Sequence, residues 1–478
     1  MAALNEVSIS PASLDRFAAV IGGDALREAK ARAASTRERM EGRTWWNVNS
    51  TSQGGGVAEM LHVLLPYVLD AGIQTRWSVL DGNQDFFRIT KRLHHALHGS
   101  AGDGSPLDED VRDRYETVLR QNQEPLIAAV KADDVVLLHD PQTAGMVQPL
   151  VEAGALVIWR CHIGSDARNE ETERGWRFLE SYLTAAAATV WSREAYIPGS
   201  IAKARAVVIV PSIDAFSPKN QELGREQTLA ILARTGLIAG PDSGKTVSYS
   251  RQDGSTGTIE RQAAVVRGGN APHPGAPVVC QISRWDPLKD HAGVMRAFAK
   301  LVENGTVGDA HLVLAGPDVT AVTDDPEGAE TYAELLAAWE ELSRDCQSRV
   351  HLANLPMADA DENAVIVNAL QRHSAVIVQK SLQEGFGLTV TEAMWKARPV
   401  LASAVGGILD QITDGEQGLL LSDPYDLDAA ADGIYGLLHD GELAGRLGTA
   451  AKERVREQFL GIRHLSDYAD LLAMVETG

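Results

Sequence analysis

The sequence predicts an α/β protein built from two parallel sheets, each with helices on its faces. Short apolar, β-branched runs alternate with longer segments of helical periodicity along most of the 478 residues. Such alternation is typical of parallel sheets, because the connection between two parallel strands needs a crossover, usually a helix. The chain is too long for one ordinary core, and a glycine- and proline-rich stretch at 268–277 suits a linker between two domains.

The first half of the chain predicts one sheet, preceded by a helical arm over 13–40. Its expected strands are 44–50, 74–80, 135–139, 156–159, 189–191 and 206–209. In parallel sheets, ligands bind beyond the C-terminal ends of the strands, so polar residues at those ends are candidates for a site. The residues at these ends are His139, Asp140, Arg160 and His162.

A glycine triplet, Gly54, Gly55 and Gly56, lies between the first expected strand and a helix expected over 57–71. Glycines at such a turn let a ligand approach the backbone closely. The loop is not a P-loop, because no Gly-Lys-Ser/Thr follows, and it lacks the GxGxxG dinucleotide fingerprint. From the residues alone, a tight turn and a ligand-binding loop remain equally open.

The second half predicts another sheet, and two cations follow its first strand. The expected strands are 278–283, 311–315, 350–353, 375–379, 399–402 and 418–421. Arg284 and Lys289 lie five residues apart, just before a helix expected over 291–303. Arginine can bridge two phosphate oxygens and lysine adds a mobile point charge, so the pair predicts an anion clamp. The alternative is a solvated loop with a surface ion pair.

The stretch 379–395 combines a strand, a glycine-rich loop and a helix start. Glu384 lies in the loop, and Glu392 lies about one turn into a helix expected to begin near Thr389. The helix start offers backbone N–H groups to a phosphate, and the two carboxylates can accept hydrogen bonds from sugar hydroxyls. Another glycine loop, at 406–407, follows the next strand at the same sheet edge. Two solvated glutamates are the alternative interpretation.

Composition excludes several classes of partner. The net charge is −21, which disfavours nucleic acid and anionic membranes. No apolar run reaches the roughly 18 residues of a membrane span, and no secretion signal is apparent at the N-terminus. Three widely spaced cysteines favour a reducing cytoplasm. No metal-binding pattern is expected; Asp324 and Asp325 are interpreted as an exposed loop.

The segment 237–277 is the least regular part of the chain. An Asp253-Gly254 pair within it predicts the turn of a β-hairpin. The segment is interpreted as a decoration that precedes the domain linker, and its sequence indicates no chemistry.

The stretch from Glu384 to Leu388 with Glu392, followed by 405–408 (VGGI), resembles the donor-binding core of retaining GT-B glycosyltransferases. The likeness extends along most of the chain and is greatest to the trehalose synthase (glycosyltransferring) group. It implies two Rossmann-like domains facing each other across a cleft. The implied divisions are an acceptor domain with its helical arm over 1–272, a donor domain over 273–455, and a helix over 456–478 that crosses back.

The resemblance also implies a role for each candidate residue. Glu384, His162, Arg284 and Lys289 are the implied catalytic residues, with Glu384 and His162 beside the transferred sugar and the two cations on the leaving diphosphate. Glu392 would hold the ribose. The other implied substrate contacts are Gly54, Gly55, Gly56, Asp140, Arg160, Phe386, Gly387, Leu388 and Thr389. Many relatives carry an aspartate two residues after the matching histidine, whereas this chain has Gly164, which leaves the acceptor open.

The implied reaction moves glucose, with retention, from ADP-, UDP- or GDP-glucose to a sugar acceptor, expected to be glucose so that trehalose forms. No tightly bound cofactor or metal is implied, and a homodimer is consistent with the resemblance. One alternative is a trehalose phosphorylase, which would need no ribose contact from Glu392. Others are a glycosyltransferase for another small-molecule acceptor and a catalytically silent sugar-nucleotide binder.

Overall fold

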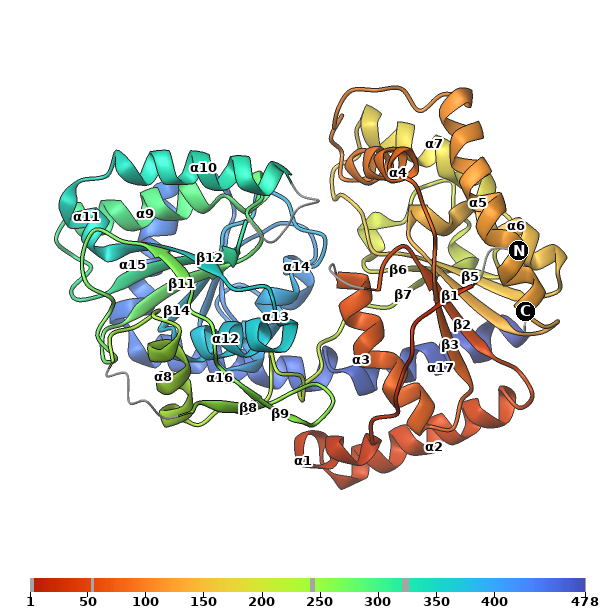
Figure 1. Cartoon of the computed structure of the whole chain (residues 1–478), viewed down its shortest axis with the longest axis horizontal. Helices are drawn as coiled ribbons and strands as arrows, with labels where there is room; N and C mark the ends of the chain where they lie inside the picture. The colour runs from red at the N-terminus through yellow and green to blue at the C-terminus, as the bar shows by residue number, and fades with distance from the viewer. Residues whose placement is uncertain (1–3, 53–55, 241–245, 320–325, 478) are drawn as a thin grey trace. The chain divides into compact units, whose positions relative to one another are not determined.

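The computed structural model describes residues 4–52, 56–240, 246–319 and 326–477. Contacts divide the chain into two compact units, Met1–Ser212 with Glu457–Gly478, and Ile213–Arg456. Each unit contains its own seven-stranded sheet with helices, so the predicted α/β class is confirmed (Figure 1). The boundary differs from the one expected at 272, because residues 213–272 are grouped with the second unit. The C-terminal segment is grouped with the first.

The first sheet has the strand order β1-β3-β2-β4-β5-β6-β7. All neighbours pair in parallel except β1, which runs antiparallel to β3. The strands are β1 (Asn5–Glu6), β2 (Trp45–Asn49), β3 (Thr75–Val79), β4 (Val135–His139), β5 (Leu156–Cys161), β6 (Ala188–Trp191) and β7 (Ala206–Val208). The order reverses between β2 and β4, and such a switch point is where open α/β sheets bind ligands.

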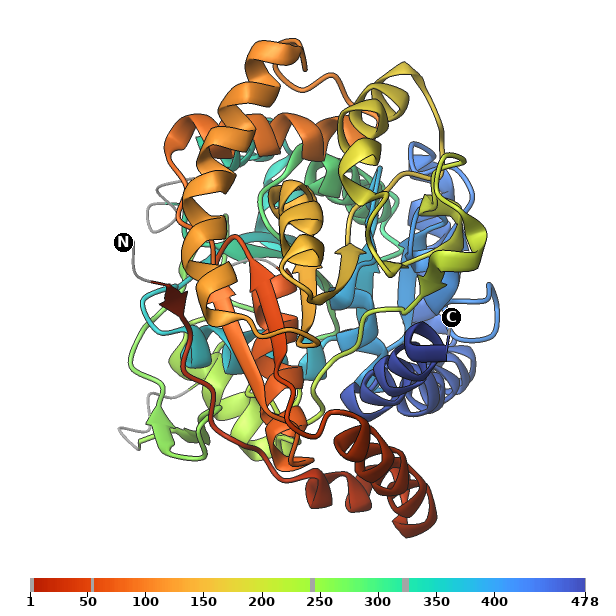
Figure 2. The same ribbon diagram turned by 90° about the vertical axis from the view of Figure 1, so that its right-hand side faces the viewer.

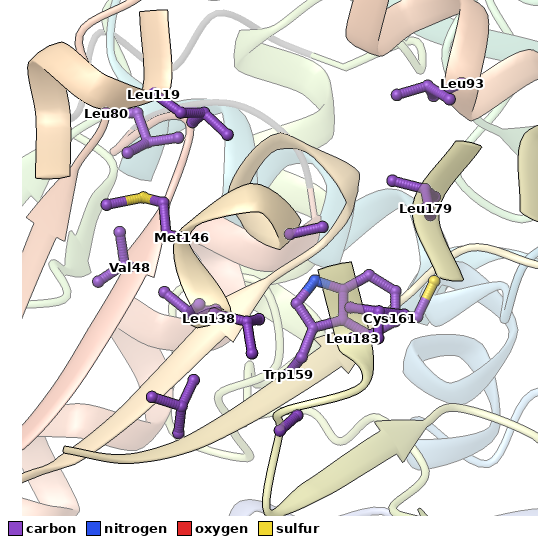
Figure 3. Close-up of a cluster of buried hydrophobic side chains, with 14 of the residues drawn as sticks. Val48, Leu80, Leu93, Leu119, Leu138, Met146, Trp159, Cys161, Leu179 and Leu183 are labelled. Carbon is purple, nitrogen blue, oxygen red and sulfur yellow. The ribbon is translucent and has the colours of Figure 1, made fainter. Parts of the chain in front are cut away.

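Helices cover both faces of the first sheet, because successive apolar residues of its strands point to opposite faces and both faces must be buried. One core, which includes Leu138, Trp159 and Leu179, packs beneath α4 to α7 (Figure 3). The other includes Trp45 and Leu137 and packs against α3 and α17. The helices are α1 (Ala18–Ile21), α2 (Gly23–Arg39), α3 (Gly56–Asp70), α4 (Gln84–Leu97), α5 (Glu109–Ala129), α6 (Val147–Glu152), α7 (Glu170–Leu183) and α17 (Gly461–Thr477).

The N-terminal arm was expected as one helix over 13–40 but is divided. A 3₁₀ turn (Leu14–Phe17) and α1 precede α2, and Gly22 separates the two helices with φ 83°. Glycine adopts this positive φ without the steric penalty of a side chain. Helix α2 then lies against α17, from the other end of the chain, where Arg32 pairs with Asp470 at 3.1 Å (Figure 2).

The second sheet has the order β10-β13-β12-β11-β14-β15-β16, with only β10 antiparallel. Its order reverses between β11 and β14, which is the second switch point. The strands are β10 (Ala264–Val266), β11 (Val278–Ile282), β12 (His311–Pro317), β13 (Val350–Leu355), β14 (Val376–Gln379), β15 (Val400–Ser403) and β16 (Leu419–Leu421). Strand β10 explains the shifted boundary, because its hydrogen bonds to β13 tie the preceding segment to this unit.

The helices of the second unit surround this sheet. They are α8 (Arg225–Arg234), α9 (His291–Glu303), α10 (Pro326–Glu340), α11 (Arg344–Arg349), α12 (Ala360–His373), α13 (Leu388–Trp395), α14 (Ile408–Gln411), α15 (Leu427–His439) and α16 (Gly441–Gln458), the last of which runs into the first unit. Among the described residues, no helix combines the length and apolarity needed to cross a membrane.

The predicted hairpin is confirmed. Strands β8 (Ser248–Ser250) and β9 (Thr256–Thr258) pair antiparallel, and Gly254 in the turn has φ 82°. The hairpin is fastened to the start of α12, where Arg251 donates to both carboxylate oxygens of Asp359.

Candidate active site

In the second unit, the loops after β11 and β14 meet at the switch point. Lys289 Nζ lies 2.7 Å from Glu384 Oε2, and Ser381 Oγ donates to the same oxygen at 3.0 Å. The two charged side chains are 15% and 10% exposed. The fold therefore brings together two residues that lie 95 positions apart and that the sequence predicted for one site.

A polar network fixes the backbone that carries Lys289. Gln281 donates from Nε2 to the Lys289 carbonyl at 2.7 Å and accepts from the Lys380 N–H at 3.1 Å. The completely buried Lys380 forms an ion pair with Asp290, the N-cap of α9. Asp290 adopts φ 48°, so this turn is strained as well as charged. The network thus fixes the main chain at Lys289, and this in turn positions the Lys289 side chain.

Arg284 occupies a different environment at the end of β11. Its side chain is 66% exposed, and Nη2 lies 3.3 Å from Asp286 Oδ2. Asp286 also caps the short turn Pro287–Lys289 by accepting from the Leu288 N–H at 2.8 Å. The two residues predicted to form an anion clamp thus differ in burial, since Lys289 is 15% exposed and Arg284 is 66% exposed.

Helix α13 begins at the second candidate feature, the glycine-rich loop. Gly387 precedes Leu388, the first helical residue, with φ 85°, and no side chain caps the helix. The first turn thus presents backbone N–H groups, the arrangement expected of an anion site. Thr389 donates its hydroxyl to Gln379 Oε1 at 3.1 Å, so it holds the helix to β14.

The second glycine loop, which was predicted at the same sheet edge, packs directly on the first. The Gly407 N–H donates to the Gly385 carbonyl at 3.2 Å. A Cβ atom at Gly407 would come within 2.6 Å of Phe386 Cα, so only glycine allows this approach. Gln411 supports the same loop by donating from its amide to the Phe386 carbonyl.

Glu392 is 3% exposed and lies beside two lysines that the sequence analysis missed. Lys219 Nζ is 3.4 Å from Glu392 Oε1. Lys396 donates to the Glu392 carbonyl at 3.1 Å and to Asn220 Oδ1 at 2.9 Å. Burial lowers the pKa of Lys396 to about 7, against the attraction of Glu392. The spacing of Lys396, four residues after Glu392, was the one available signal; Lys219 is distant in sequence.

In the first unit, the ends of β4 and β5 bring His139, Asp140 and His162 together. His139 Nδ1 lies 3.1 Å from His162 Nε2, and the rings are stacked at 17°. The His162 N–H donates to Asp140 Oδ1 at 2.7 Å. Asp140 adopts φ 63° and ψ 175°, a region normally restricted to glycine. Such strain costs about 1–3 kcal/mol and clusters at ligand sites.

Replacing Asp140 with Asn should change how stability depends on pH. Burial raises the pKa of Asp140 to about 7, against the His162 N–H and Arg160. Between pH 4 and 7 the folded chain therefore keeps a proton that the unfolded chain releases, and stability falls as pH rises. The full shift corresponds to about 4 kcal/mol, and partial solvent contact reduces this to about 2. Relative to wild type, the free energy of unfolding of Asp140→Asn should therefore rise by that amount from pH 5 to pH 8, as measured by urea unfolding.

The matched control for this measurement is Asp85→Asn, because Asp85 forms an exposed pair with Arg88 at 3.2 Å. Its stability relative to wild type should stay constant across the same pH range. A constant difference for Asp140→Asn as well would contradict the assignment.

Arg160 is a correction to the predicted site. The side chain is completely buried, and Nη1 donates to His464 Nε2 at 2.7 Å and to the Tyr468 hydroxyl. Nη2 donates to the Ile209 carbonyl at 3.1 Å. The guanidinium therefore holds α17 against the sheet, and it is not available to contact an acceptor sugar.

The remaining candidates are placed as follows. Gly56 is the first residue of α3, whereas Gly54 and Gly55, like Asp324 and Asp325, lie outside the described residues. At Gly164 a Cβ atom would come within 2.1 Å of Tyr196 Cγ, so the tyrosine ring occupies the space that a side chain at this position would need. Within the described ranges, no group of three or more His, Cys, Asp or Glu residues could hold a metal ion.

Family models match both units. Residues 47–198 match the N-terminal domain of trehalose synthase, and residues 266–454 match glycosyl transferases group 1. A trehalose synthase from Pyrococcus horikoshii is 34% identical over 98% of each chain. The chain belongs to the trehalose synthase family. It is accordingly an enzyme that transfers a hexosyl group in trehalose metabolism.

Three further proteins resemble this trehalose synthase family member. A trehalose synthase from Rubrobacter xylanophilus is 34% identical over 91% of each chain. A trehalose phosphorylase from Pleurotus pulmonarius is 25% identical, with 90% of this chain and 57% of that protein covered. An α,α-trehalose-phosphate synthase (UDP-forming) from Burkholderia vietnamiensis has a TM-score of 0.65 at 14% identity, over 90% and 98% of the two chains. That likeness confirms the GT-B fold.

Proposed function

We propose that this enzyme transfers glucose, with retention of configuration, from a nucleoside diphosphate glucose to glucose, giving trehalose. The observation that carries the proposal is the Lys289–Glu384 pair at the switch point of the second sheet, beside the uncapped start of α13. One cation, one carboxylate and a row of N–H groups suit a ligand that is part phosphate and part sugar. The E. coli structure described as trehalose-6-phosphate bound with UDP-2-fluoro glucose has the same fold, with a TM-score of 0.65.

In the proposed reaction, the bond between the anomeric carbon and the diphosphate oxygen breaks, and its electron pair stays on that oxygen. Lys289, Arg284 and the N–H groups at 387–389 would stabilise this growing charge more than the ground state, which lowers the barrier. The acceptor hydroxyl oxygen bonds to the anomeric carbon, and its proton moves to the departing diphosphate. Glu384 would orient hydroxyls of the transferred sugar.

The remaining roles follow from the same proposal. Glu392, held by Lys219, would bind the ribose of the donor. His162 and Asp140 of the first unit would contact the sugars, and Gly54–Gly56 the diphosphate. Phe386, which is buried under the second glycine loop, would shape the donor site without a polar contact. The three cysteines are free and buried, in keeping with a cytoplasmic enzyme; a homodimer is part of the expectation.

A donor panel tests the proposal. Nucleoside diphosphate release should be measured from ADP-, UDP- and GDP-glucose with and without glucose, and trehalose should be identified as the product. We expect glucose-dependent release with at least one donor, lost in Glu384→Ala and kept in Glu453→Ala, whose carboxylate forms an exposed pair with Arg456. Glucose 1-phosphate formed from trehalose and phosphate would instead indicate a phosphorylase. Release to water, or to another acceptor alone, would overturn the proposed acceptor.

A further inference from the structure

Three polar side chains form a row through the first unit to the strand ends. Asn47 projects from the middle of β2, His139 ends β4, and His162 follows β5. Asn47 Oδ1 lies 3.3 Å from His139 Nε2, and His139 Nδ1 lies 3.1 Å from His162 Nε2. Asn47 and His139 are each 1% exposed, so water does not compete for these contacts.

The carbonyl group of Asn47 decides which ring nitrogens of His139 and His162 carry a proton. A carbonyl oxygen only accepts hydrogen bonds, so His139 must present Nε2–H to Asn47. Burial and the nearby charge of Arg160 lower the pKa of both His139 and His162 well below the usual value, so each ring is neutral and carries one proton. His139 Nδ1 is then an acceptor, which His162 satisfies with Nε2–H. His162 is left with an unprotonated Nδ1.

The surroundings of Asn47 support this orientation of its amide. Among the described residues, Asn47 Nδ2 has no hydrogen-bond partner, and Asn47 lines a cavity of about 50 Å³ together with Met60, Leu64 and Tyr468. The cavity exceeds the about 10–15 Å³ that one water occupies, and most of its lining is apolar. The carbonyl oxygen is the end of the amide that lies within hydrogen-bond distance of the histidine.

We propose that Asn47 is a positioning residue that fixes the tautomer of His139 and, through it, leaves His162 Nδ1 as a hydrogen-bond acceptor for a sugar hydroxyl. Only the identity of that last ligand rests on the proposed function. The proton arrangement of the row is a property of the protein without substrate. Asn47 itself touches no substrate in this scheme.

A third histidine in the same unit provides an internal reference. Arg160 can only donate, so His464 Nε2, which lies 2.7 Å from Arg160 Nη1, is unprotonated. His464 therefore carries its proton on Nδ1, which lies 2.9 Å from Ser212 Oγ. Burial and Arg160 also hold the pKa of His464 well below the usual value. His139 and His162 are therefore expected to carry their proton on Nε2, and His464 is expected to carry it on Nδ1.

The decisive measurement is the ¹⁵N spectrum of the full chain labelled on histidine, with signals assigned by single histidine substitutions. We expect Nε2–H tautomers for His139 and His162 and the Nδ1–H tautomer for His464. An Nδ1–H tautomer at His139 would overturn the proposal, whether or not the enzyme transfers glucose. Failure of the proposed function would appear only in the donor panel, so the two failures are distinguishable.

Two substitutions at Asn47 then separate positioning from packing. Asn47→Leu removes the acceptor, whereas Asn47→Asp keeps an acceptor facing His139. We expect mixed tautomers at His139 and a roughly tenfold lower kcat in Asn47→Leu, and native tautomers with kcat within about threefold of wild type in Asn47→Asp. Equal losses in both variants with unchanged spectra would contradict positioning. Ser212→Ala, which removes the partner of His464 Nδ1, should leave the His139 and His162 signals unchanged.

Discussion

Replacing Lys289 with Met should lower kcat about 10²- to 10³-fold while leaving the fold intact. Lys289 Nζ lies 2.7 Å from Glu384 Oε2 in a site where the cation is 15% exposed, so little solvent is available to replace its charge. Removing one preorganised donor to a developing anion costs that much in other enzymes. The measurement is steady-state release of nucleoside diphosphate with the preferred donor and glucose.

Two further variants show whether the charge or its placement matters. Lys289→Arg keeps the charge but changes its shape, and it should recover only part of the activity. Lys300→Met is the matched control, because Lys300 is 39% exposed and pairs with Asp428 on the surface. Lys300→Met should retain wild-type kcat. If Lys289→Met also stayed within threefold of wild type, the proposed role of Lys289 would be wrong.

Replacing Asp290 with Asn should destabilise the second unit by about 3 kcal/mol. Lys380 is completely buried, and Asp290 is the acidic partner that neutralises it. Asparagine keeps an oxygen for the Gly293 N–H, which Asp290 accepts at 3.0 Å, and it tolerates the positive φ at this position. The substitution therefore removes the charge but keeps the cap, and it leaves an uncompensated lysine in the interior.

The loss of stability in Asp290→Asn is measured from the midpoint and slope of urea unfolding at pH 7. Asp428→Asn is the control, since its exposed pair with Lys300 should contribute less than about 1 kcal/mol. Equal stabilities for the two variants would mean that Lys380 finds other compensation. Lys380→Met in the Asp290→Asn background should restore stability, because it removes the buried charge itself.

Local patterns predicted most of both sheets. The apolar runs that become β4, β11 and β14 are short, β-branched and bounded by polar or glycine residues, so their periodicity and length identify them without tertiary information. The hairpin turn at Gly254 and the glycine loop at Gly407 were also predictable from local sequence, since Gly254 has a positive φ and a Cβ atom at Gly407 would clash with Phe386. Strand β10 has the same three residues, Ala-Val-Val, as β7, and it was missed because it lies in the segment interpreted as a decoration before the linker.

The sequence by itself determined the α/β class, the family and the candidate residues at the strand ends, because these depend on composition, periodicity and short motifs. Only the tertiary structure decided which polar groups meet across the chain. It paired Lys289 with Glu384 and Lys219 with Glu392, and it turned Arg160 toward α17. Sheet order and helix packing set these contacts, and no local pattern carries that information.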